Sequence, residues 1–364
     1  RNNIDICKAA CGKSNIKFIG FDLGAIPKWL KGVIPGGIFI YACFWQFGLA
    51  HRYSKLSQKF DIVHSVNFVS DTIPSFAYKF DAITVWGPLS HHEVVPIEIS
   101  GVRNFILSKS KMIIRKFLWK IFNIRKKIQK FDLVLFSNES VFERLGNFEN
   151  VIKWSSTGLN KNPTIFGPKP LTDKCFLVYA ARMVPIKGWD VIIKILGELS
   201  KTKLENAIHF DLIGDGPLSK KIQKSLSNIQ PNPLISWSLH GALPYDEYLK
   251  LIKKSDIYVC PSFEGGGIAV AEAMSYAIPV VCFDNYGPGE TVGKSYPGTV
   301  TIGKNGKYSV CAFQDKVLEL IKDDKLRTEL SKITIKRVED DLLWEKKCEN
   351  LAAKYKEVLK ENVQ

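Results

Sequence analysis

The chain has 364 residues, of which 46% are hydrophobic and 24% charged, so it is long enough for two α/β domains and too apolar for a disordered protein. Lys and Arg outnumber Asp and Glu by 51 to 36, which indicates an anionic partner such as nucleic acid, acidic lipid or a phosphorylated substrate. The eight cysteines lack the C-x-x-C spacing of zinc or redox sites. We therefore expect reduced core cysteines and a cytoplasmic protein.

Short β-branched or aromatic runs alternate with longer helical patterns in the first half of the chain. Strands are expected at residues 16–21, 61–64, 83–86 and 133–136. This alternation is typical of βαβ units on a parallel sheet. The apolar run at residues 32–50 is broken by Pro and Gly near its start and contains a glutamine, so a membrane-spanning helix is not favoured there.

Residues 101–130 contain ten Lys or Arg and no acidic residue, with apolar residues interleaved. This pattern predicts one or two amphipathic helices that lie on an anionic membrane surface. A helix with its apolar face in the core and its charges in water is an alternative. Nucleic-acid binding is a third possibility, but no helix-turn-helix, zinc or RNA-binding motif accompanies the charge, and we do not expect a nucleic-acid partner.

Residues 160–173 are rich in Pro, Gly and Lys and form the best candidate for a linker between domains. After them the alternation of strands and helices resumes. Strands are expected at residues 176–180, 210–213, 235–239, 257–260 and 280–283. Two Rossmann-like domains follow from this order, and ligands of such sheets bind beyond the carboxyl ends of the strands.

Arg182 and Lys187 follow the first of these strands and precede a helix that starts near Trp189. Two cations at a strand-to-helix turn can hold a diphosphate, although charges on a surface loop are the alternative. Gly214 and Gly216 permit a tight turn after the next strand, but the rest of a dinucleotide fingerprint is missing, so a structural turn is favoured.

Three glycines, Gly265, Gly266 and Gly267, follow a strand and lead through Ile268 into a helix. They allow close approach of the backbone to an anion at the helix start. Glu264 precedes them and Glu272 lies on the helix, eight positions later. A carboxylate near a helix start often serves only as a cap, but two of them around a glycine loop favour a binding site. Residues 284–291 form another turn that ends near an acid, Glu290.

Together these motifs resemble the family 4 glycosyltransferases, which are retaining enzymes with the GT-B fold. The resemblance rests on Arg182, Lys187-Gly188, Gly214-x-Gly216-Pro217, His240-Gly241, Pro261-Ser262, Glu264-x7-Glu272-Ala273 and Pro279-Val280-Val281. Residues 60–67 and 85–88 are similar to segments of bacterial members that build surface polysaccharides. Those members continue into a run of glycines, whereas this chain has Leu-Ser-His-His-Glu at residues 89–93.

The resemblance implies a GT-B fold, with two Rossmann-like domains whose parallel sheets face each other across a cleft. We expect an acceptor-side domain at residues 1–165, a nucleotide-sugar domain at residues 172–342, and a final helix at residues 343–364 that packs back toward the first domain. The first domain of this fold opens with a strand and a glycine-rich loop. Residues 1–15 offer neither, so we expect that a segment is missing before them.

The resemblance also assigns roles to individual residues. Arg182 and Lys187 are expected to hold the donor diphosphate in place of a metal, so no metal or other cofactor is expected. Glu272 is expected to bind the ribose hydroxyls. Glu264, with the amides of Gly265, Gly266, Gly267 and Ile268, is expected to hold the transferred sugar, and Gly214 and Gly216 adjoin this donor site. His91 or His92 is expected to orient or deprotonate the acceptor hydroxyl; a solvated loop histidine is the alternative.

The function implied is transfer of a hexose-type sugar from a nucleotide-sugar donor to a saccharide acceptor in surface polysaccharide synthesis. We expect an acceptor carried on a polyprenyl diphosphate, and a protein peripheral to the inner leaflet of the plasma membrane. Another GT-B enzyme, such as a nucleotide-sugar epimerase or a phosphorylase, is one alternative. A non-catalytic basic module that binds membranes is the other.

Overall fold

The computed structural model describes residues 16–24, 37–54, 60–66, 68–91, 94–160, 174–303 and 306–361. Contacts group the chain into two units, which are described one at a time. Unit 1 takes in residues 1–89, 119–135 and 148–152, and unit 2 takes in residues 90–118, 136–147 and 153–364. Apart from Asn160, the predicted linker at residues 160–173 lies outside the described residues, and the predicted domain limits at residues 165 and 172 stay predictions.

Unit 1 is built on a four-stranded sheet with the order β1-β2-β3-β4. Its strands are β1 (Ile62–Ser65), β2 (Ile83–Leu89), β3 (Leu133–Phe136) and β4 (Val151–Lys153), and its described helices include α3 (Gly37–Tyr53), η2 (Ala77–Lys79) and α5 (Ile124–Ile128). Strands β1 and β2 are parallel. The predictions of β1, β2 and β3 are confirmed, and β4 was not predicted.

The predicted strand at residues 16–21 is wrong, because the segment is irregular. Its β-branched residues are more than half exposed, Ile16 at 58% and Ile19 at 55%. Phe21 packs instead against the rings of Trp45 and Tyr53 on α3. A strand requires a neighbouring strand to accept its backbone hydrogen bonds, and this segment packs on a helix.

Unit 2 contains a six-stranded sheet with the order β10-β9-β8-β5-β6-β7, and every pairing in it is parallel. The strands are β5 (Lys174–Ala180), β6 (Ala207–Ile213), β7 (Ile235–Gly241), β8 (Ile257–Cys260), β9 (Val280–Phe283) and β10 (Thr299–Val300). All residues of β8 and β9 are buried, as expected for parallel strands covered on both faces. The five predicted strands are confirmed, and β10 was not predicted.

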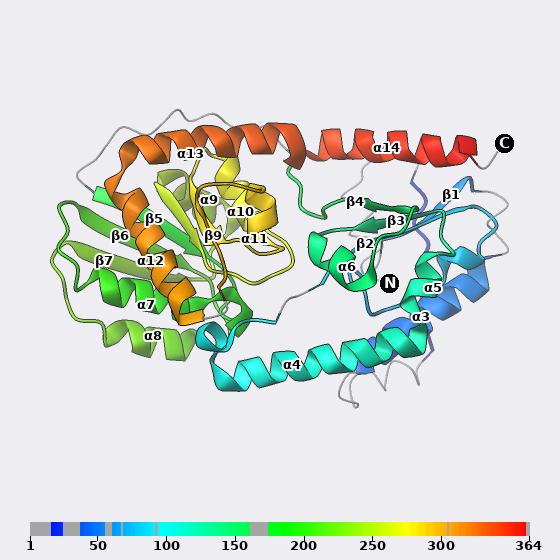
Figure 1. The fold of residues 1–364 in the computed structure, drawn as a ribbon, viewed down its shortest axis with the longest axis horizontal. Helices are drawn as coiled ribbons and strands as arrows, with labels where there is room; N and C mark the ends of the chain where they lie inside the picture. Colours follow the sequence, from blue (N-terminus) through cyan, green and yellow to red (C-terminus); the bar gives the residue numbers. More distant parts are fainter. Residues whose placement is uncertain are drawn as a thin grey trace. The chain divides into compact units, whose positions relative to one another are not determined.

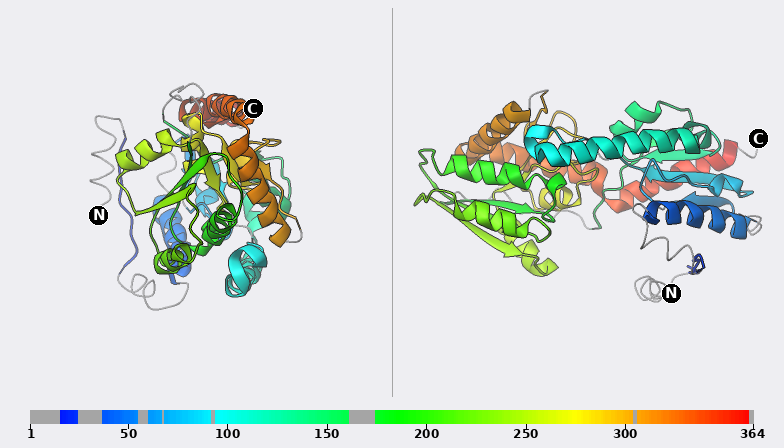
Figure 2. Two further views of the ribbon diagram at one scale, coloured as in Figure 1. Left: turned by 90° about the vertical axis from the view of Figure 1, so that its left-hand side faces the viewer. Right: turned by 90° about the horizontal axis from the view of Figure 1, so that it is seen from below.

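The helices of unit 2 cover both faces of this sheet (Figure 1 and Figure 2). From β5 to β7 the chain steps toward one edge through α7 (Trp189–Leu199) and α8 (Ser219–Ser227), which contact each other. It then returns through α9 (Tyr245–Lys254) and steps the other way through α10 (Ile268–Ser275). Because such crossovers are right-handed, the reversal places α9 and α10 on the opposite face from α7 and α8.

The reversal makes β5 and β8 neighbours whose following helices cover opposite faces. The carboxyl ends of two such strands open a crevice, which is where ligands of open α/β sheets bind. The loop after β5 carries Arg182 and Lys187, and the loop after β8 carries Glu264. The chain order of the strands therefore explains why these three residues lie in one region.

Two predicted helical segments are found among the remaining helices. The remaining helices are α4 (Ile97–Phe122), α6 (Glu139–Leu145), η3 (Pro185–Lys187), α11 (Pro288–Val292), α12 (Gly306–Lys322), α13 (Asp324–Arg337), the π-helical turn η4 (Val338–Leu342) and α14 (Trp344–Glu361). The helical prediction for residues 101–130 corresponds to α4 and α5, and that for residues 343–364 to α14. Among the described helices, none has both the length and the apolar character to cross a bilayer.

Candidate active site

The loops after β5 and β8 pack directly on each other. The amide of Phe263 donates a hydrogen bond to the carbonyl of Ile186 at 2.9 Å. Gly188 has a φ of +71°, and a Cβ built on it would lie 2.2 Å from the carbonyl oxygen of Pro261. Glycine is therefore required at this position, both for its backbone conformation and for the close approach of the two loops.

Lys187 and Glu264 form an ion pair across these loops. Their side chains are 16% and 30% exposed, so the pair is partly shielded from water. The phenol of Tyr179 donates a hydrogen bond to the carbonyl of Lys187, and burial raises the pKa of Tyr179 well above its usual value, so this phenol stays a donor. The sequence predicted Lys187 and Glu264 in one site, and the structure brings them together.

Arg182 lies in the same loop but is exposed. Within the residues that the structure describes, its guanidinium forms no ion pair, whereas the charge of Lys187 already faces a carboxylate. The indole of Trp189 donates to the carbonyl of Arg182 at 3.0 Å and anchors its backbone. Arg182 therefore offers the more accessible positive charge to an anionic ligand.

The Gly214 and Gly216 turn supports the loop that carries Arg182. Both glycines have positive φ, +142° and +153°, and a Cβ on them would lie 1.9 Å from the carbonyl oxygen of Ala181 and 2.8 Å from that of Met183. The amide of Met183 donates to the carbonyl of Asp215 at 2.8 Å. These contacts give the turn a structural role, and a contact of the glycines with a ligand stays a prediction.

The predicted glycine loop at residues 265–267 leads directly into α10, as expected. A Cβ on Gly267 would lie 2.4 Å from Oγ1 of Thr291, and the Gly267 amide donates to Oγ1 of Thr157 at 3.4 Å. Ile268, the first residue of α10, is 52% exposed. The helix start is thus held in place while its first side chain faces solvent.

The loop after β9 braces the glycine loop, and Asn285 makes the contacts. Its Nδ2 donates to the carbonyl of Ser262 at 2.7 Å, and its Oδ1 accepts from the amides of Gly287 and Gly289, each at 3.2 Å. A Cβ on Gly287 would lie 1.7 Å from the carbonyl oxygen of Glu264. The sequence predicts only a turn at residues 284–291 and does not single out Asn285.

Glu272 projects from α10 and accepts hydrogen bonds from two tyrosines of α9. The Tyr245 hydroxyl donates to Oε1 at 3.1 Å, and the Tyr248 hydroxyl donates to Oε2 at 2.9 Å. Burial and the neighbouring Glu272 charge raise the pKa of Tyr245 to about 12. Neither tyrosine was predicted as a site residue from the sequence, although their spacing of three residues at a helix start was an available signal.

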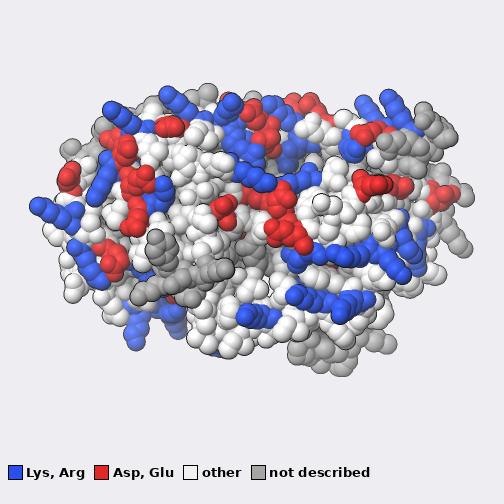
Figure 3. All heavy atoms as spheres, in the orientation of Figure 1, with Lys and Arg blue, Asp and Glu red and all other residues white. Residues whose placement is uncertain are grey.

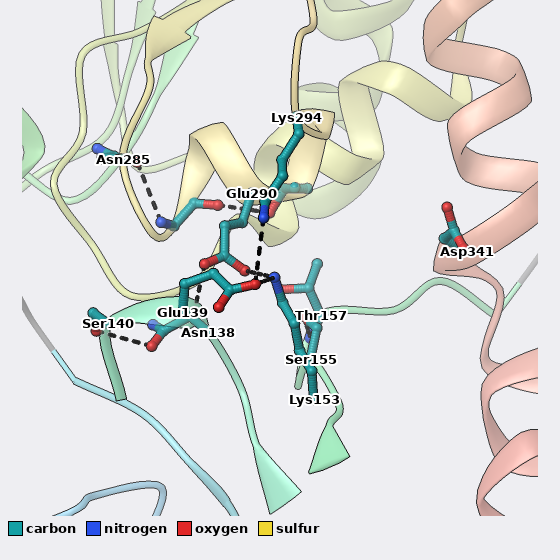
Figure 4. A network of polar contacts seen from close by, with 12 residues as sticks. Asn138, Glu139, Ser140, Lys153, Ser155, Thr157, Asn285, Glu290, Lys294 and Asp341 are labelled. Carbon is teal, nitrogen blue, oxygen red and sulfur yellow. Dashed lines mark hydrogen bonds and ion pairs between the residues drawn. The ribbon is translucent and has the colours of Figure 1, made fainter. Parts of the chain in front are cut away.

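A network of charges joins α6, α11 and the end of β4 (Figure 4). One carboxylate oxygen of Glu290 accepts from the amide of Glu139 at 2.7 Å, and the other lies 2.8 Å from Nζ of Lys153. Lys153 also lies 3.0 Å from Glu139. Burial lowers the pKa of Lys153, but its hydrogen bonds to both glutamates outweigh burial and raise it. Glu290 is thus an anchor of the loop after β9.

His91 is buried, with 3% of its surface exposed, and His92 lies outside the described residues. The solvated alternative is wrong for His91. The helix α4 begins a few residues later, and a cavity of about 300 Å³ lies between α4 and residues 184–186. Asn104, Lys111 and Arg115 are among its lining residues, so the cavity offers positive charge beside apolar surface.

The apolar side chains of α4 are largely exposed. Seven of them are 50% to 68% exposed: Val102, Ile106, Leu107, Ile113, Ile114, Phe117 and Ile121. The alternative in which the apolar face of this helix lies in the core is therefore wrong for these residues. On the face drawn in Figure 3, Lys and Arg are interspersed with Asp and Glu, so the net charge alone does not locate a ligand site there.

Metal ligation has no candidate cluster in the ranges that the structure describes: no three His, Cys, Asp or Glu side chains group closely enough to hold an ion. Lys187 forms an ion pair with Glu264, the residue that precedes the glycine loop.

Comparison with known proteins finds a family to which the second half of the chain is similar. Residues 161–337 match the family Glycosyl transferases group 1. An uncharacterized glycosyltransferase of Methanocaldococcus jannaschii is 30% identical over 187 residues, which cover 51% of this chain and 49% of that protein. The poly(ribitol-phosphate) alpha-N-acetylglucosaminyltransferase of Staphylococcus aureus is 30% identical over 165 residues, 44% of this chain and 31% of that protein. The chain thus spans half or less of these two relatives.

The fold has a counterpart among solved structures. A mutant of TarM from S. aureus, in complex with Fondaparinux, alpha-GlcNAc-glycerol and UDP, has a TM-score of 0.54 and 22% identity, and the match covers 76% of this chain and 51% of that one. At this level of identity the likeness concerns the fold. The chain therefore has the GT-B fold that the sequence predicted, and its residues 161–337 are similar to the Glycosyl transferases group 1 family.

Proposed function

We propose that the protein is a retaining glycosyltransferase that moves a hexose-type sugar from a nucleotide-sugar donor to a lipid-linked saccharide in surface polysaccharide synthesis. The observation that carries the proposal is the ion pair of Lys187 and Glu264, formed at the carboxyl ends of β5 and β8 beside the start of α10. This is the crevice in which open α/β sheets bind phosphorylated ligands.

The donor diphosphate is held by Arg182, Lys187 and the amides at the start of α10 in this proposal. When the glycosidic bond breaks, the diphosphate gains negative charge, and two fixed cations stabilise that charge. They fulfil the role that a metal ion fulfils in other transferases, so we propose a reaction without metal. Glu272 binds the ribose hydroxyls.

Glu264 acts on the transferred sugar. As the bond to the diphosphate breaks, the sugar ring acquires positive, oxocarbenium-like character, which a nearby carboxylate stabilises. The acceptor then attacks from the face that the diphosphate leaves, so the configuration is retained and no protein nucleophile is needed. The ion pair with Lys187 fixes the position of this carboxylate before the donor binds.

The acceptor is proposed to carry a phosphorylated lipid. The cavity beside α4 has Lys111 and Arg115 in its lining, which suits a phosphate, and the exposed apolar residues of α4 suit a membrane surface. We propose His91 as the group that orients or deprotonates the acceptor hydroxyl. Its side chain is buried, so contact with an acceptor hydroxyl requires movement of the residues that cover it.

The names of two matched proteins support this proposal. One is named as a poly(ribitol-phosphate) alpha-N-acetylglucosaminyltransferase, and the TarM structure holds UDP. For this chain, UDP is therefore the first nucleotide to test.

A thermal-shift screen against UDP-, GDP- and ADP-sugars tests the donor site, because a ligand that binds only the folded state raises the melting temperature. We expect at least one of them to raise it, and Arg182→Ala or Glu272→Ala to abolish the rise. Glu198→Ala, which removes an exposed carboxylate of α7, is the control and should leave the rise unchanged. A full rise in both site variants would contradict the assignment.

Product analysis separates this function from its alternatives. Transfer of the sugar to an added saccharide acceptor is expected. Interconversion of free nucleotide sugars would instead indicate an epimerase, and dependence on inorganic phosphate would indicate a phosphorylase. Binding of the donor without turnover of any kind would favour the remaining alternative, a non-catalytic module that binds membranes.

Co-sedimentation with vesicles tests the membrane surface. Binding is expected to vesicles that contain phosphatidylglycerol and to be much weaker with phosphatidylcholine alone, since Lys and Arg near an anionic surface each contribute about 1 kcal/mol. Phe117→Ser should weaken binding, because the residue is 64% exposed on α4. Leu234→Ser, at an exposed leucine before β7, is the control. Equal binding of both vesicle types would contradict the proposal.

A further inference from the structure

Glu272 differs from the other acidic residues of the site in its partners. Among the described residues, its carboxylate is held by two neutral phenols, those of Tyr245 and Tyr248, and by no cation. By contrast, Glu264 faces Lys187. A carboxylate that faces no cation remains a strong acceptor for the hydroxyl groups of a ligand.

The two phenols occupy only part of the capacity of this carboxylate. An ionised carboxylate has about four lone-pair positions, about two on each oxygen. One phenol takes one position on Oε1 and the other takes one on Oε2. About two positions remain, one on each oxygen, which matches the two adjacent hydroxyls of a ribose.

The phenols also keep the carboxylate in one orientation. Tyr245 is the first residue of α9 and Tyr248 is three positions later, so both side chains lie on one side of the helix. Burial and the charge of Glu272 raise the pKa of both tyrosines, that of Tyr245 to about 12. They remain protonated donors at neutral pH, and Glu272 loses its rotational freedom before a ligand arrives.

We propose that Tyr245 and Tyr248 are positioning residues that hold Glu272 to accept hydrogen bonds from the 2′- and 3′-hydroxyls of the donor ribose. The site therefore takes donors built on a ribonucleoside diphosphate and rejects those built on a 2′-deoxyribonucleoside diphosphate. A 2′-deoxy donor leaves one oxygen of a carboxylate that the two phenols hold in place without its hydrogen bond from the ligand, which costs affinity. This inference rests on the proposed function, because it takes Glu272 as the ribose-binding residue.

Isothermal titration calorimetry of the full chain with UDP and 2′-deoxy-UDP, with GDP and 2′-deoxy-GDP, and with ADP and 2′-deoxy-ADP, tests the inference. Each pair differs in a single hydroxyl, so the ratio of the two Kd values reports on that hydroxyl alone. For the wild type we expect the ribonucleotide of the binding pair to be tighter by about tenfold or more. The double variant Tyr245→Phe/Tyr248→Phe should reduce this ratio to about threefold or less, and each single variant should give an intermediate ratio.

Two controls separate positioning from structure. Tyr355→Phe removes a phenol on α14 and should keep the wild-type ratio. Tyr245→Phe alters a side chain that is 59% exposed, so it should fold even where the double variant does not. A merely structural role would weaken both nucleotides of a pair equally and leave their ratio unchanged.

The outcomes are distinguishable. If the wild type binds a ribonucleotide without preferring it to the 2′-deoxy form, or if Tyr245→Phe and the folded double variant keep the wild-type ratio, the inference is overturned while the proposed donor site stands. If the wild type binds none of UDP, GDP and ADP, the proposed function itself is overturned, and this inference with it.

Discussion

Replacing Gly188 by alanine tests whether close packing of the two loops forms the site. The added Cβ would lie 2.2 Å from the carbonyl oxygen of Pro261 and 2.9 Å from its carbonyl carbon. These are backbone atoms, which cannot turn away as the end of a flexible side chain can. The positive φ costs about 1–2 kcal/mol, and the clash adds about 1–3 kcal/mol. We therefore expect the free energy of unfolding to fall by about 2–5 kcal/mol.

Gly241→Ala is the matched control. Gly241 has a φ of +68°, close to the +71° of Gly188, but no heavy atom lies within 4 Å of its added Cβ. Only the backbone cost of about 1–2 kcal/mol is expected there. The difference between the two variants, about 1–3 kcal/mol, isolates the contact with Pro261. Urea unfolding measures it, provided that the slope with urea is the same in both variants.

The same variant carries a functional consequence. Movement of either loop disturbs the bond between Phe263 and Ile186 and separates Lys187 from Glu264. Gly188→Ala should therefore weaken nucleotide binding at a temperature where it is still folded, whereas Gly241→Ala should not. Equal losses of stability in the two variants, or wild-type nucleotide affinity in folded Gly188→Ala, would refute the reasoning.

Three further predictions concern residues outside the two loops. Burial and Arg337 lower the pKa of Lys347 to about 8, so the unfolded chain binds more protons above that pH. Relative to Lys347→Met, the free energy of unfolding of the wild type should rise by up to about 1.4 kcal/mol between pH 8.5 and 9.5, as measured by urea unfolding. An equal dependence of the unfolding free energy on pH in the two proteins would contradict this. Glu290→Gln alters a side chain that is 16% exposed and should lower the free energy of unfolding by about 1.5–3 kcal/mol. Glu198→Gln, in an exposed pair, should lower it by at most about 1 kcal/mol. Equal losses of stability would contradict the role of Glu290 as an anchor of the loop after β9. His91→Asn should lower the transfer rate about a hundredfold or more with the donor thermal shift unchanged; a wild-type rate would exclude a role as base.

The fold was predictable where the sequence carries a continuous apolar run. The predictions for β3, β8 and β9 agree with the structure to the residue, because strands buried on both faces have few polar residues. Residues 16–21 show that β-branched composition alone is insufficient, since pairing with a neighbouring strand decides the outcome. Strands β4 and β10 were missed because three and two residues are too few for a pattern.

The site was predictable where topology brings residues together. Lys187 and Glu264 are 77 positions apart but follow adjacent strands, so the rule for strand ends places them in one crevice. The tyrosine pair could not be predicted in the same way. Tyr245 and Tyr248 lie 27 and 24 positions before Glu272, on a helix start, where an exposed tyrosine resembles any surface residue. Lys153 and Asn285 were not predicted either, because the residues that they contact are determined by the packing of separate loops and helices.

A crystal structure of the chain with the nucleoside diphosphate that gives the largest thermal shift tests the central claim most directly. The account predicts both phosphates next to Arg182 and Lys187 at the start of α10, with the ribose hydroxyls on Glu272. A nucleotide bound well anywhere else, with the loops after β5 and β8 unoccupied, would contradict it.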